Sequence, residues 1–286
     1  MGAITQAMAA YAQAHGAEIE VDAAVREIHV ANGKACGVVT EDGKVVTARA
    51  VAGNLHPQTL LTRLLDPNLL EPDTRRRIEA YRSHSATFRM NVALSELPRF
   101  ANVPDQSDAI FGGAIEICPS LDYMCRAYTD AITQGWSNEP IVSMWLPTTQ
   151  DTSLAPEGGH VASLFCQHFQ RHLPRGQSWD EVKSEVADVV VNTVNRYAPN
   201  FKASILGQQI KSPLDIERDL GMVGGDIFHG RLHLDQLFSL RPVAGYADYR
   251  MPVESLYLCG SGAHPGGGVT GLPGRNCAAE MLKDMK

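Results

Sequence analysis

The first fifteen residues carry hydrophobic side chains at helical spacing. Ile4, Met8 and Tyr11 recur within residues 3–15 at intervals that place them on one face of a helix. Gly16 follows directly, and glycine readily takes the left-handed conformation that ends many helices. The pattern therefore predicts an amphipathic helix over residues 3–15.

Short runs rich in β-branched residues come next. Two dipeptides, Asn32–Gly33 and Asp42–Gly43, separate the last three of these runs. Asn-Gly and Asp-Gly favour two-residue hairpin turns, because such turns need a positive φ at their central positions. We expect a lead-in strand and then a three-stranded antiparallel meander within the first 53 residues. The runs cover residues 18–21, 25–30, 35–40 and 44–53.

The middle of the chain alternates between helical and strand periods. Ser178 and Glu181 form a capping-box pair at the start of its longest helical segment. The alternation over residues 57–220 predicts an α+β substrate domain. We expect helices over 57–65, 71–82, 119–134 and 178–197, and strands over 84–97, 140–147 and 160–169.

The charge balance and the cysteines narrow the class of protein. The 286 residues carry 25 Lys and Arg against 32 Asp and Glu, a net charge of −7. That balance argues against a basic nucleic-acid binder. No apolar run approaches the roughly 18 residues of a membrane span, and no targeting signal is recognisable, so we expect a cytoplasmic protein. The cysteines show no C-x-x-C spacing, so we expect reduced thiols and no metal site.

The end of the chain carries the pattern that points to chemistry. An apolar run at 256–259 predicts a buried strand, and residues 277–285 predict a helix. Between them the segment 260–274 is dense in glycine, which removes side chains from a backbone that a ligand can then approach. The unpaired N–H groups at a helix start carry the positive end of the helix dipole. We expect this loop to bind an anion or a group on which negative charge develops.

Three glycines of this loop match a dinucleotide-binding motif in form only. Gly266, Gly268 and Gly271 fit the pattern G-x-G-x-x-G. That fingerprint needs a β-α-β unit of about 30 residues and an acidic residue about 20 positions further on. The chain ends at residue 286, too soon for either, so we reject this interpretation.

Three segments resemble one family of enzymes. The tail 241–282, the segment 16–46 and the segment 155–168 are similar to parts of phytoene-desaturase-related, FAD-dependent oxidoreductases. The similarity is greatest to the subgroup named for a pyridine nucleotide-disulfide oxidoreductase domain, and GSGAHPGGGVTGLPGRN at 260–276 is its most specific motif. The resemblance implies a FAD-linked reductase fold of the α+β or α/β class, with an antiparallel β-meander and a mixed-sheet substrate domain. It divides the chain into a partial FAD-binding domain (1–56), a substrate domain (57–240) and a flavin-contacting segment (241–286).

The same resemblance implies an activity and a set of cofactor contacts. Members transfer a hydride between an apolar small-molecule substrate and FAD. Through the resemblance, the backbone of Val25 is expected at the adenine end of FAD, and Gly260 and Ser261 along its phosphate–ribityl side. The residues expected beside the isoalloxazine ring are Gly268, Val269, Thr270 and Gly271.

One departure from the family opens an alternative. Family members begin with a β-α-β unit that bears G-x-G-x-x-G, and this sequence contains no such unit, so we expect a truncated chain that binds FAD weakly or not at all. The alternative is a non-catalytic remnant that binds a ligand or partner without FAD. In both cases the surface that would pack on the missing unit is left exposed. An exposed apolar surface favours a partner, so we expect a homo-oligomer, most simply a two-fold dimer.

Other candidate residues lie near the loop or in pairs. His264 is the one ionisable side chain between Gly260 and Gly274, and is our candidate for protonating near the flavin. Arg241 is expected to position the loop or to reach a carboxylate or phosphate. The glycines at 221, 224 and 225 predict a tight turn, which is our candidate for a turn facing the flavin or the substrate. The pairs His168/His172 and His229/His233 would suit a metal only on helices; residues 160–169 are predicted to be a strand, so we expect a polar lining instead.

Overall fold

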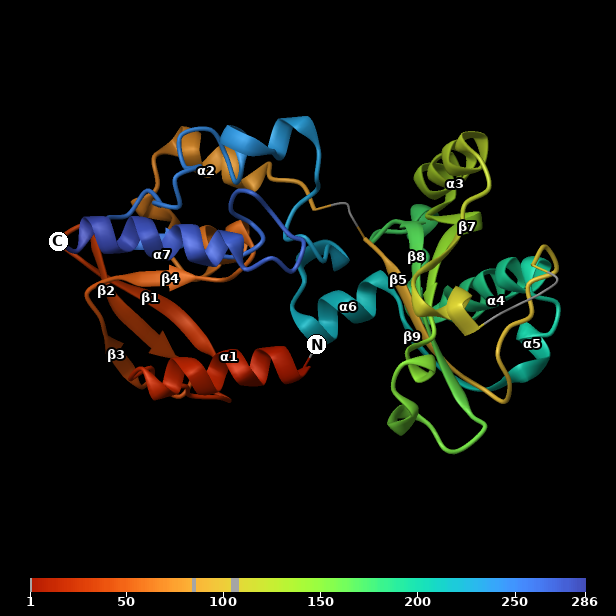
Figure 1. The fold of residues 1–286 in the computed structure, drawn as a ribbon. Helices are drawn as coiled ribbons and strands as arrows, with labels where there is room; N and C mark the ends of the chain where they lie inside the picture. The colour runs from red at the N-terminus through yellow and green to blue at the C-terminus, as the bar shows by residue number, and fades with distance from the viewer. Residues whose placement is uncertain (1, 84–85, 104–107) are drawn as a thin grey trace.

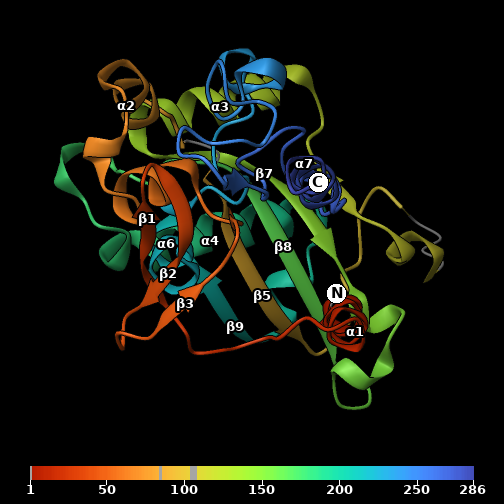
Figure 2. The ribbon, with the colours of Figure 1, turned by 90° about the vertical axis from the view of Figure 1, so that its left-hand side faces the viewer.

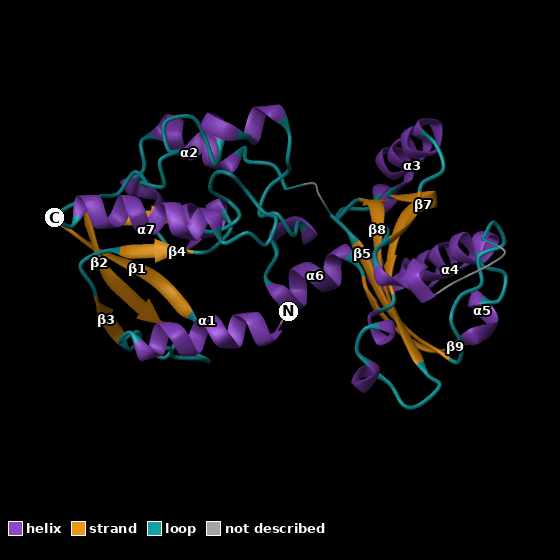
Figure 3. Ribbon diagram, viewed as in Figure 1, coloured by secondary structure: helices purple, strands orange, loops and turns teal. Residues whose placement is uncertain are grey.

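The computed structural model describes residues 2–83, 86–103 and 108–286, and Figure 1 shows them arranged in two lobes. The first lobe is built from both ends of the chain. It contains one three-stranded sheet, one two-stranded parallel pair and three helices, as Figure 3 shows by colour. Its elements are α1 (Gly2–Ala14), β1 (Val25–Ala31), β2 (Lys34–Thr40), β3 (Val45–Thr47), β4 (Val51–Gly53), α2 (Pro72–Glu79), β10 (Leu256–Leu258) and α7 (Leu272–Asp284).

The helix and meander predicted at the start of the chain are confirmed. β1, β2 and β3 pair in sequence order and antiparallel. Asn32 and Gly33 both have positive φ, 51° and 77°, as the tight turn between β1 and β2 requires. α1 lies at one side of this lobe, as Figure 2 shows, and its apolar face, formed by Ile4, Met8 and Tyr11, is exposed.

Two details of the N-terminal prediction are wrong. Residues 18–21 form no strand; they are exposed and have no strand to pair with. The run 44–53 is not one strand but two, because the chain turns between β3 and β4. β4 then pairs in parallel with β10, with Val51 opposite Leu256. This pairing joins segments some two hundred residues apart, and no local pattern could reveal it.

The second lobe is a five-stranded sheet covered by helices. Its strands run in the order β6-β7-β8-β5-β9, and every neighbouring pair is antiparallel. The mixed sheet expected here is therefore not found. β8 and β9, which α4 connects, run in the same direction. They do not pair with each other, because β5 lies between them and is antiparallel to both. The elements are β5 (Phe88–Leu94), β6 (Ile115–Ile117), α3 (Leu121–Gln134), β7 (Trp136–Trp145), β8 (His160–Phe169), α4 (Trp179–Tyr197), α5 (Phe201–Ser204), β9 (Ile205–Lys211) and α6 (Pro213–Leu220).

The helices of the middle segment follow the sequence signals. The capping box of Ser178 and Glu181 is formed at the start of α4, and α3 ends at Gly135, whose φ is 100°. The segment predicted at 57–65 forms a short π-helical turn, Thr59–Arg63. The strand predicted at 84–97 is β5, and residues 84–85 of that prediction lie outside the described part of the chain.

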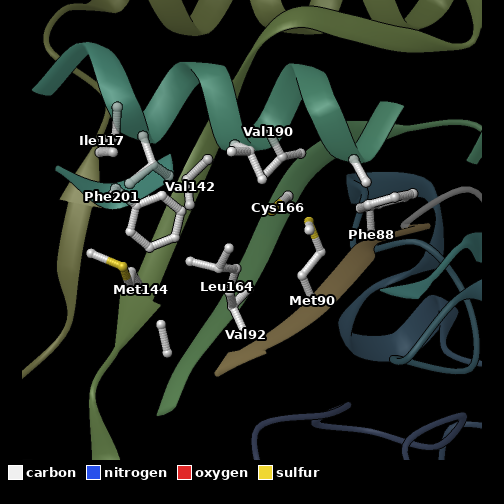
Figure 4. Packing of buried hydrophobic residues seen from close by; sticks show 14 of the residues in the cluster. Phe88, Met90, Val92, Ile117, Val142, Met144, Leu164, Cys166, Val190 and Phe201 are labelled. Atoms are coloured by element: carbon white, nitrogen blue, oxygen red, sulfur yellow. The ribbon is translucent and has the colours of Figure 1, made fainter. Parts of the chain in front are cut away.

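The larger core lies between α4 and one face of the second sheet. Alternate residues of β5, such as Phe88, Met90 and Val92, point toward α4, and Figure 4 shows Leu164 and Val190 packed among them. The opposite face of the sheet is only partly covered by α3, which packs against β7 through Tyr123, Ala127 and Ala131. The sheet therefore keeps part of one face available to other segments.

The chain crosses between the lobes near Ser83 and again near Gly224. A Cβ on Gly224 would lie 2.6 Å from the carbonyl oxygen of Ser83, so only glycine fits the close approach of these two crossings. The hydroxyl of Tyr81 donates a hydrogen bond to the carbonyl oxygen of His229 at 2.9 Å. The tight turn predicted over 221–225 is thus confirmed, and its close packing is against the junction of the lobes.

Candidate functional site

The glycine-rich loop leaves the end of a buried strand. β4 and β10 are parallel, so their carboxyl ends lie at the same edge, and Asn54 follows one strand as Cys259 follows the other. In open sheets with parallel strands, ligands bind outside such carboxyl ends. A pocket of about 470 Å³ lies at this edge, lined by Asn54, Cys259 and the loop, with Met8 of α1 at its margin.

The glycines on the inner side of the loop are required by close packing. A Cβ on Gly260 would lie 1.9 Å from the side-chain oxygen of Asn54, and a Cβ on Gly267 would lie 2.4 Å from the ring of Phe228. Both distances are too short for any side chain. These glycines set the path of the loop against its neighbours.

The tip of the loop is different, because it is exposed and its backbone is strained. Gly268 and Gly271 have φ of 136° and 69° and meet open space, apart from the Thr270 side chain near Gly268. Val269 has a φ of 56°, which a β-branched residue seldom adopts, and is 84% exposed. Strained residues held at exposed positions cluster at functional sites. The tip is therefore the part of the loop best suited to contact a ligand.

The helix after the loop begins earlier than predicted. α7 starts at Leu272 rather than 277, because Pro273 is compatible with the first turn of a helix. The N–H of Leu272 donates to the Thr270 hydroxyl at 3.2 Å, and Pro273 has no N–H. The first two positions of the helix therefore offer no amide to a ligand, and the helix N-terminus contributes less than the sequence suggested.

Arg241 fixes the loop from beneath. Its side chain is fully buried, and its guanidinium donates to the carbonyl oxygens of Ser261 at 2.6 Å and Phe228 at 2.7 Å. Burial lowers its pKa, while the charges of Tyr81 and Asp226 act in the opposite direction. Arg241 thus positions the loop, as one prediction held, but it does so through carbonyl oxygens rather than a carboxylate or phosphate.

His264 lies on the inner half of the loop. Its Nδ1 is buried and has no hydrogen-bond partner among the described residues. The hydroxyl of Tyr249 donates to its carbonyl oxygen at 2.9 Å, and Asn276 in turn donates to that hydroxyl at 2.9 Å. The sequence did not single out Asn54, Tyr249 or Asn276, and no motif marked them.

The structure brings most of the expected cofactor contacts together. Gly260, Ser261 and the tip residues 268–271 all line the same pocket. Val25 does not line it; it is half-buried at the start of β1, opposite Thr40 of β2. The assignment of these residues to parts of FAD stays a prediction.

The histidine pairs do not share helices. His168 lies in β8, and His229 lies in a turn with a φ of 53°. Within the described residues there is no cluster of three or more side chains suited to holding a metal ion. All six cysteines are free thiols. The same part of the chain contains no helix with the length and apolar character of a membrane span.

One protein family and several curated proteins are similar to this chain in sequence. The family described as flavin containing amine oxidoreductase matches residues 1–118. The chain is 41% identical to pyridine nucleotide-disulfide oxidoreductase domain-containing protein 2 of Rattus norvegicus. The match covers the whole of this chain and 50% of that protein. It is also 27% identical to a lycopene-forming phytoene desaturase of Pseudescherichia vulneris, again over the whole chain and over 55% of that relative. The chain is therefore similar in sequence to a pyridine nucleotide-disulfide oxidoreductase domain-containing protein and to a phytoene desaturase.

Solved structures of this kind confirm the FAD-linked reductase fold. An oxidoreductase from Methanosarcina mazei matches 95% of the chain with 51% of its own length, at a TM-score of 0.53 and 16% identity. Cyclohexylamine oxidase from Brevibacterium oxydans matches 87% of the chain with 46% of its own length, at a TM-score of 0.52 and 13% identity. The chain spans about half the length of the curated relatives it matches.

The loop fits one part of the cofactor that this relationship implies. Its exposed tip offers an open backbone surface around Gly268 and Gly271, where an added Cβ would meet no more than the Thr270 side chain. Such a surface suits a planar ring. The sequence contains no β-α-β unit with a glycine fingerprint, so the described residues fit the ring and its ribityl side better than the pyrophosphate.

Proposed function

We propose that this chain is the substrate-binding and flavin-contacting part of a FAD-dependent oxidoreductase that transfers a hydride between an apolar substrate and the flavin. The observation that carries the proposal is the loop 260–271, whose strained, exposed tip lines a pocket at the carboxyl ends of β4 and β10. FAD, when bound, supplies the redox chemistry; the protein's part is to bind, orient and exclude water.

In this proposal each part of the site has one task. Gly260 and Ser261 lie along the phosphate–ribityl side, and the tip residues 268–271 support the ring. Arg241 keeps the loop in place through Ser261, and Val25 contacts the adenine end. His264 is the candidate proton donor, supported by its unpartnered Nδ1. The division into 1–56, 57–240 and 241–286, the cytoplasmic location and a homo-oligomer belong to the same proposal.

The alternative is a remnant that binds a ligand or partner without FAD. It draws on the 286 residues given containing no β-α-β unit with the glycine fingerprint that binds the pyrophosphate in dinucleotide-binding folds. It predicts a folded chain with no saturable flavin binding.

Flavin titration with two matched glycine variants separates these hypotheses. Gly268→Val places a side chain on the tip, where it would block a planar ligand. Gly176→Val is the control, because Gly176 also has a positive φ, 72°, and open space around it, but lies in the second lobe. FAD is added to each purified protein, and flavin fluorescence and thermal melting are recorded.

We expect weak but saturable flavin binding by the unaltered chain. Gly268→Val should abolish it, and Gly176→Val should leave it intact. The melting temperatures check that both variants stay folded, since each places a valine at a positive φ. An absence of saturable binding, or an equal effect of both variants, favours the remnant.

A further inference from the structure

A second pocket, of about 350 Å³, lies on the partly covered face of the five-stranded sheet. Side chains of β8 alternate, so Leu164 and Cys166 point toward α4 while Phe165 and Gln167 point to the other face and line this pocket. The remaining walls come from Tyr128 of α3 and from segment 228–233. Its volume is in the range of small-ligand sites.

This pocket and the glycine-rich loop share a wall. Phe228 lines the pocket, and its ring lies against Gly267; Leu232 also lines it, with its side chain beside Gly266. Arg241 joins the same two segments, since it donates to Phe228 and to Ser261. A ligand in this pocket would therefore lie next to the loop that we propose supports the flavin.

The polar groups of the pocket are basic or neutral. Among the described residues that line it, none carries a carboxylate. Arg231 lines it with a side chain that is 19% exposed, and its Nε is buried with no hydrogen-bond partner in the described part of the chain. Its terminal nitrogen pairs with Asp235. Arg89 does not line the pocket, but it lies opposite Phe165 in the sheet, with its guanidinium 5.2 Å from the centre of the Phe165 ring.

An unpartnered buried N–H of an arginine has an energetic consequence. Such a donor has lost its water and gained nothing in return, so a ligand that accepts from it recovers a favourable interaction. A carboxylate accepts from a guanidinium most strongly. An amine would meet Arg231 and no carboxylate in the lining, which disfavours the cationic substrates that the names of some structural neighbours suggest.

We propose that this pocket binds an organic anion, a carboxylate with an apolar or aromatic body, with the carboxylate at the guanidinium of Arg231 and the body against Phe165 and Phe228. That this anion is the substrate of the enzyme rests on the proposed function, whereas its binding in the pocket needs no flavin. The body would then extend toward the shared wall and the loop.

Calorimetric titration without FAD tests the site with three matched probes. These are 4-phenylbutyrate, 4-phenylbutylamine and 4-phenylbutanol, which differ in charge but share the aromatic body. The protein variants are Arg231→Gln, which removes the donor, and Asp235→Asn, which removes the carboxylate that competes for Arg231. Arg126→Gln is the control, because Arg126 is an exposed arginine of α3 outside the pocket lining. Thermal melting of each variant is recorded alongside.

We expect the unaltered chain to prefer the carboxylate. Arg231→Gln should weaken its binding by at least about tenfold, as expected for loss of a charged hydrogen bond, and Arg126→Gln should not. Asp235→Asn should tighten it, which loss of structure could not do. Equal affinities for the three probes, no effect of Arg231→Gln, or weaker binding by Asp235→Asn would overturn the proposal. Because no flavin is present, these outcomes are independent of the FAD titration above.

Discussion

His56 makes the stability of the junction between the lobes depend on pH. Its side chain is 2% exposed. Its Nε2 lies 2.6 Å from the hydroxyl of Ser83, and its Nδ1 accepts a hydrogen bond from the amide of Gln58 at 3.2 Å. Burial is the main cause that lowers its pKa to about 3, and the positive charges of His229, Arg63 and Arg241 add to the effect.

The sign and size of the pH effect follow from that shift. Between the ordinary value of 6.5 and about 3, the unfolded chain binds a proton at His56 that the folded chain does not. Lowering the pH through this window therefore favours unfolding. Each pH unit is worth about 1.4 kcal/mol, so at pH 5 the cost is about 2 kcal/mol relative to pH 7.5.

Urea unfolding of the unaltered chain and of His56→Gln at the two pH values measures this term. Glutamine keeps a donor toward Ser83 but does not titrate, so the variant should lose about 2 kcal/mol less than the unaltered chain between pH 7.5 and 5. His29→Gln, at an exposed position of β1, is the control and should behave like the unaltered chain. If His56→Gln and the unaltered chain lose the same free energy, His56 is not held neutral by the fold.

Three further predictions concern the first lobe and the thiols. Gly43→Val should destabilise the chain by about 1–2 kcal/mol in urea unfolding, because Gly43 has a φ of 87° that a β-branched residue resists; unchanged stability would contradict the turn. Iodoacetamide should label exposed Cys125 first and leave buried Cys166 and Cys277 largely unmodified in the folded chain. Burial raises the pKa of the Cys166 thiol, and a hydrogen bond with Cys259, together with burial, raises the pKa of the Cys277 thiol, so fewer thiolates form; mass spectrometry of labelled peptides reads the order. The exposed apolar face of α1 should promote self-association, so light scattering should show a concentration-dependent mass that Met8→Gln reduces; a monomer at every concentration would contradict it.

Local signals in the sequence predicted the elements that local interactions form. Asn32–Gly33 specifies a turn within four residues, and the capping box of Ser178 specifies the start of α4 within one turn. The prediction failed where pairing is distant. β4 needs β10 for its hydrogen bonds, and the run 18–21 has the composition of a strand but no partner. Composition can mark a segment as compatible with a strand, but only tertiary contact makes it one.

The same difference between local and distant contacts applies to the candidate site. The glycines of the loop lie close together in the sequence and predicted its position, although not that α7 begins at Leu272. The pocket proposed to bind an organic anion has no comparable signal in the sequence. Phe165, Phe228 and Arg231 come from β8 and from the return crossing, and their neighbourhood exists only because the two crossings pack together near Ser83.

Arg241 shows why the two pockets belong to one site. Burying a guanidinium costs free energy that only several well-formed hydrogen bonds offset. The bonds that Arg241 makes are to carbonyl oxygens of segment 228–230, of Gln236 and of Ser261. A side chain that served only the loop would not need the first two. Because one buried cation holds both segments, the wall formed by Phe228 cannot shift without moving the base of the loop. An anion at Arg231 and a ring at the loop tip, both as proposed above, would therefore be positioned by the same contacts.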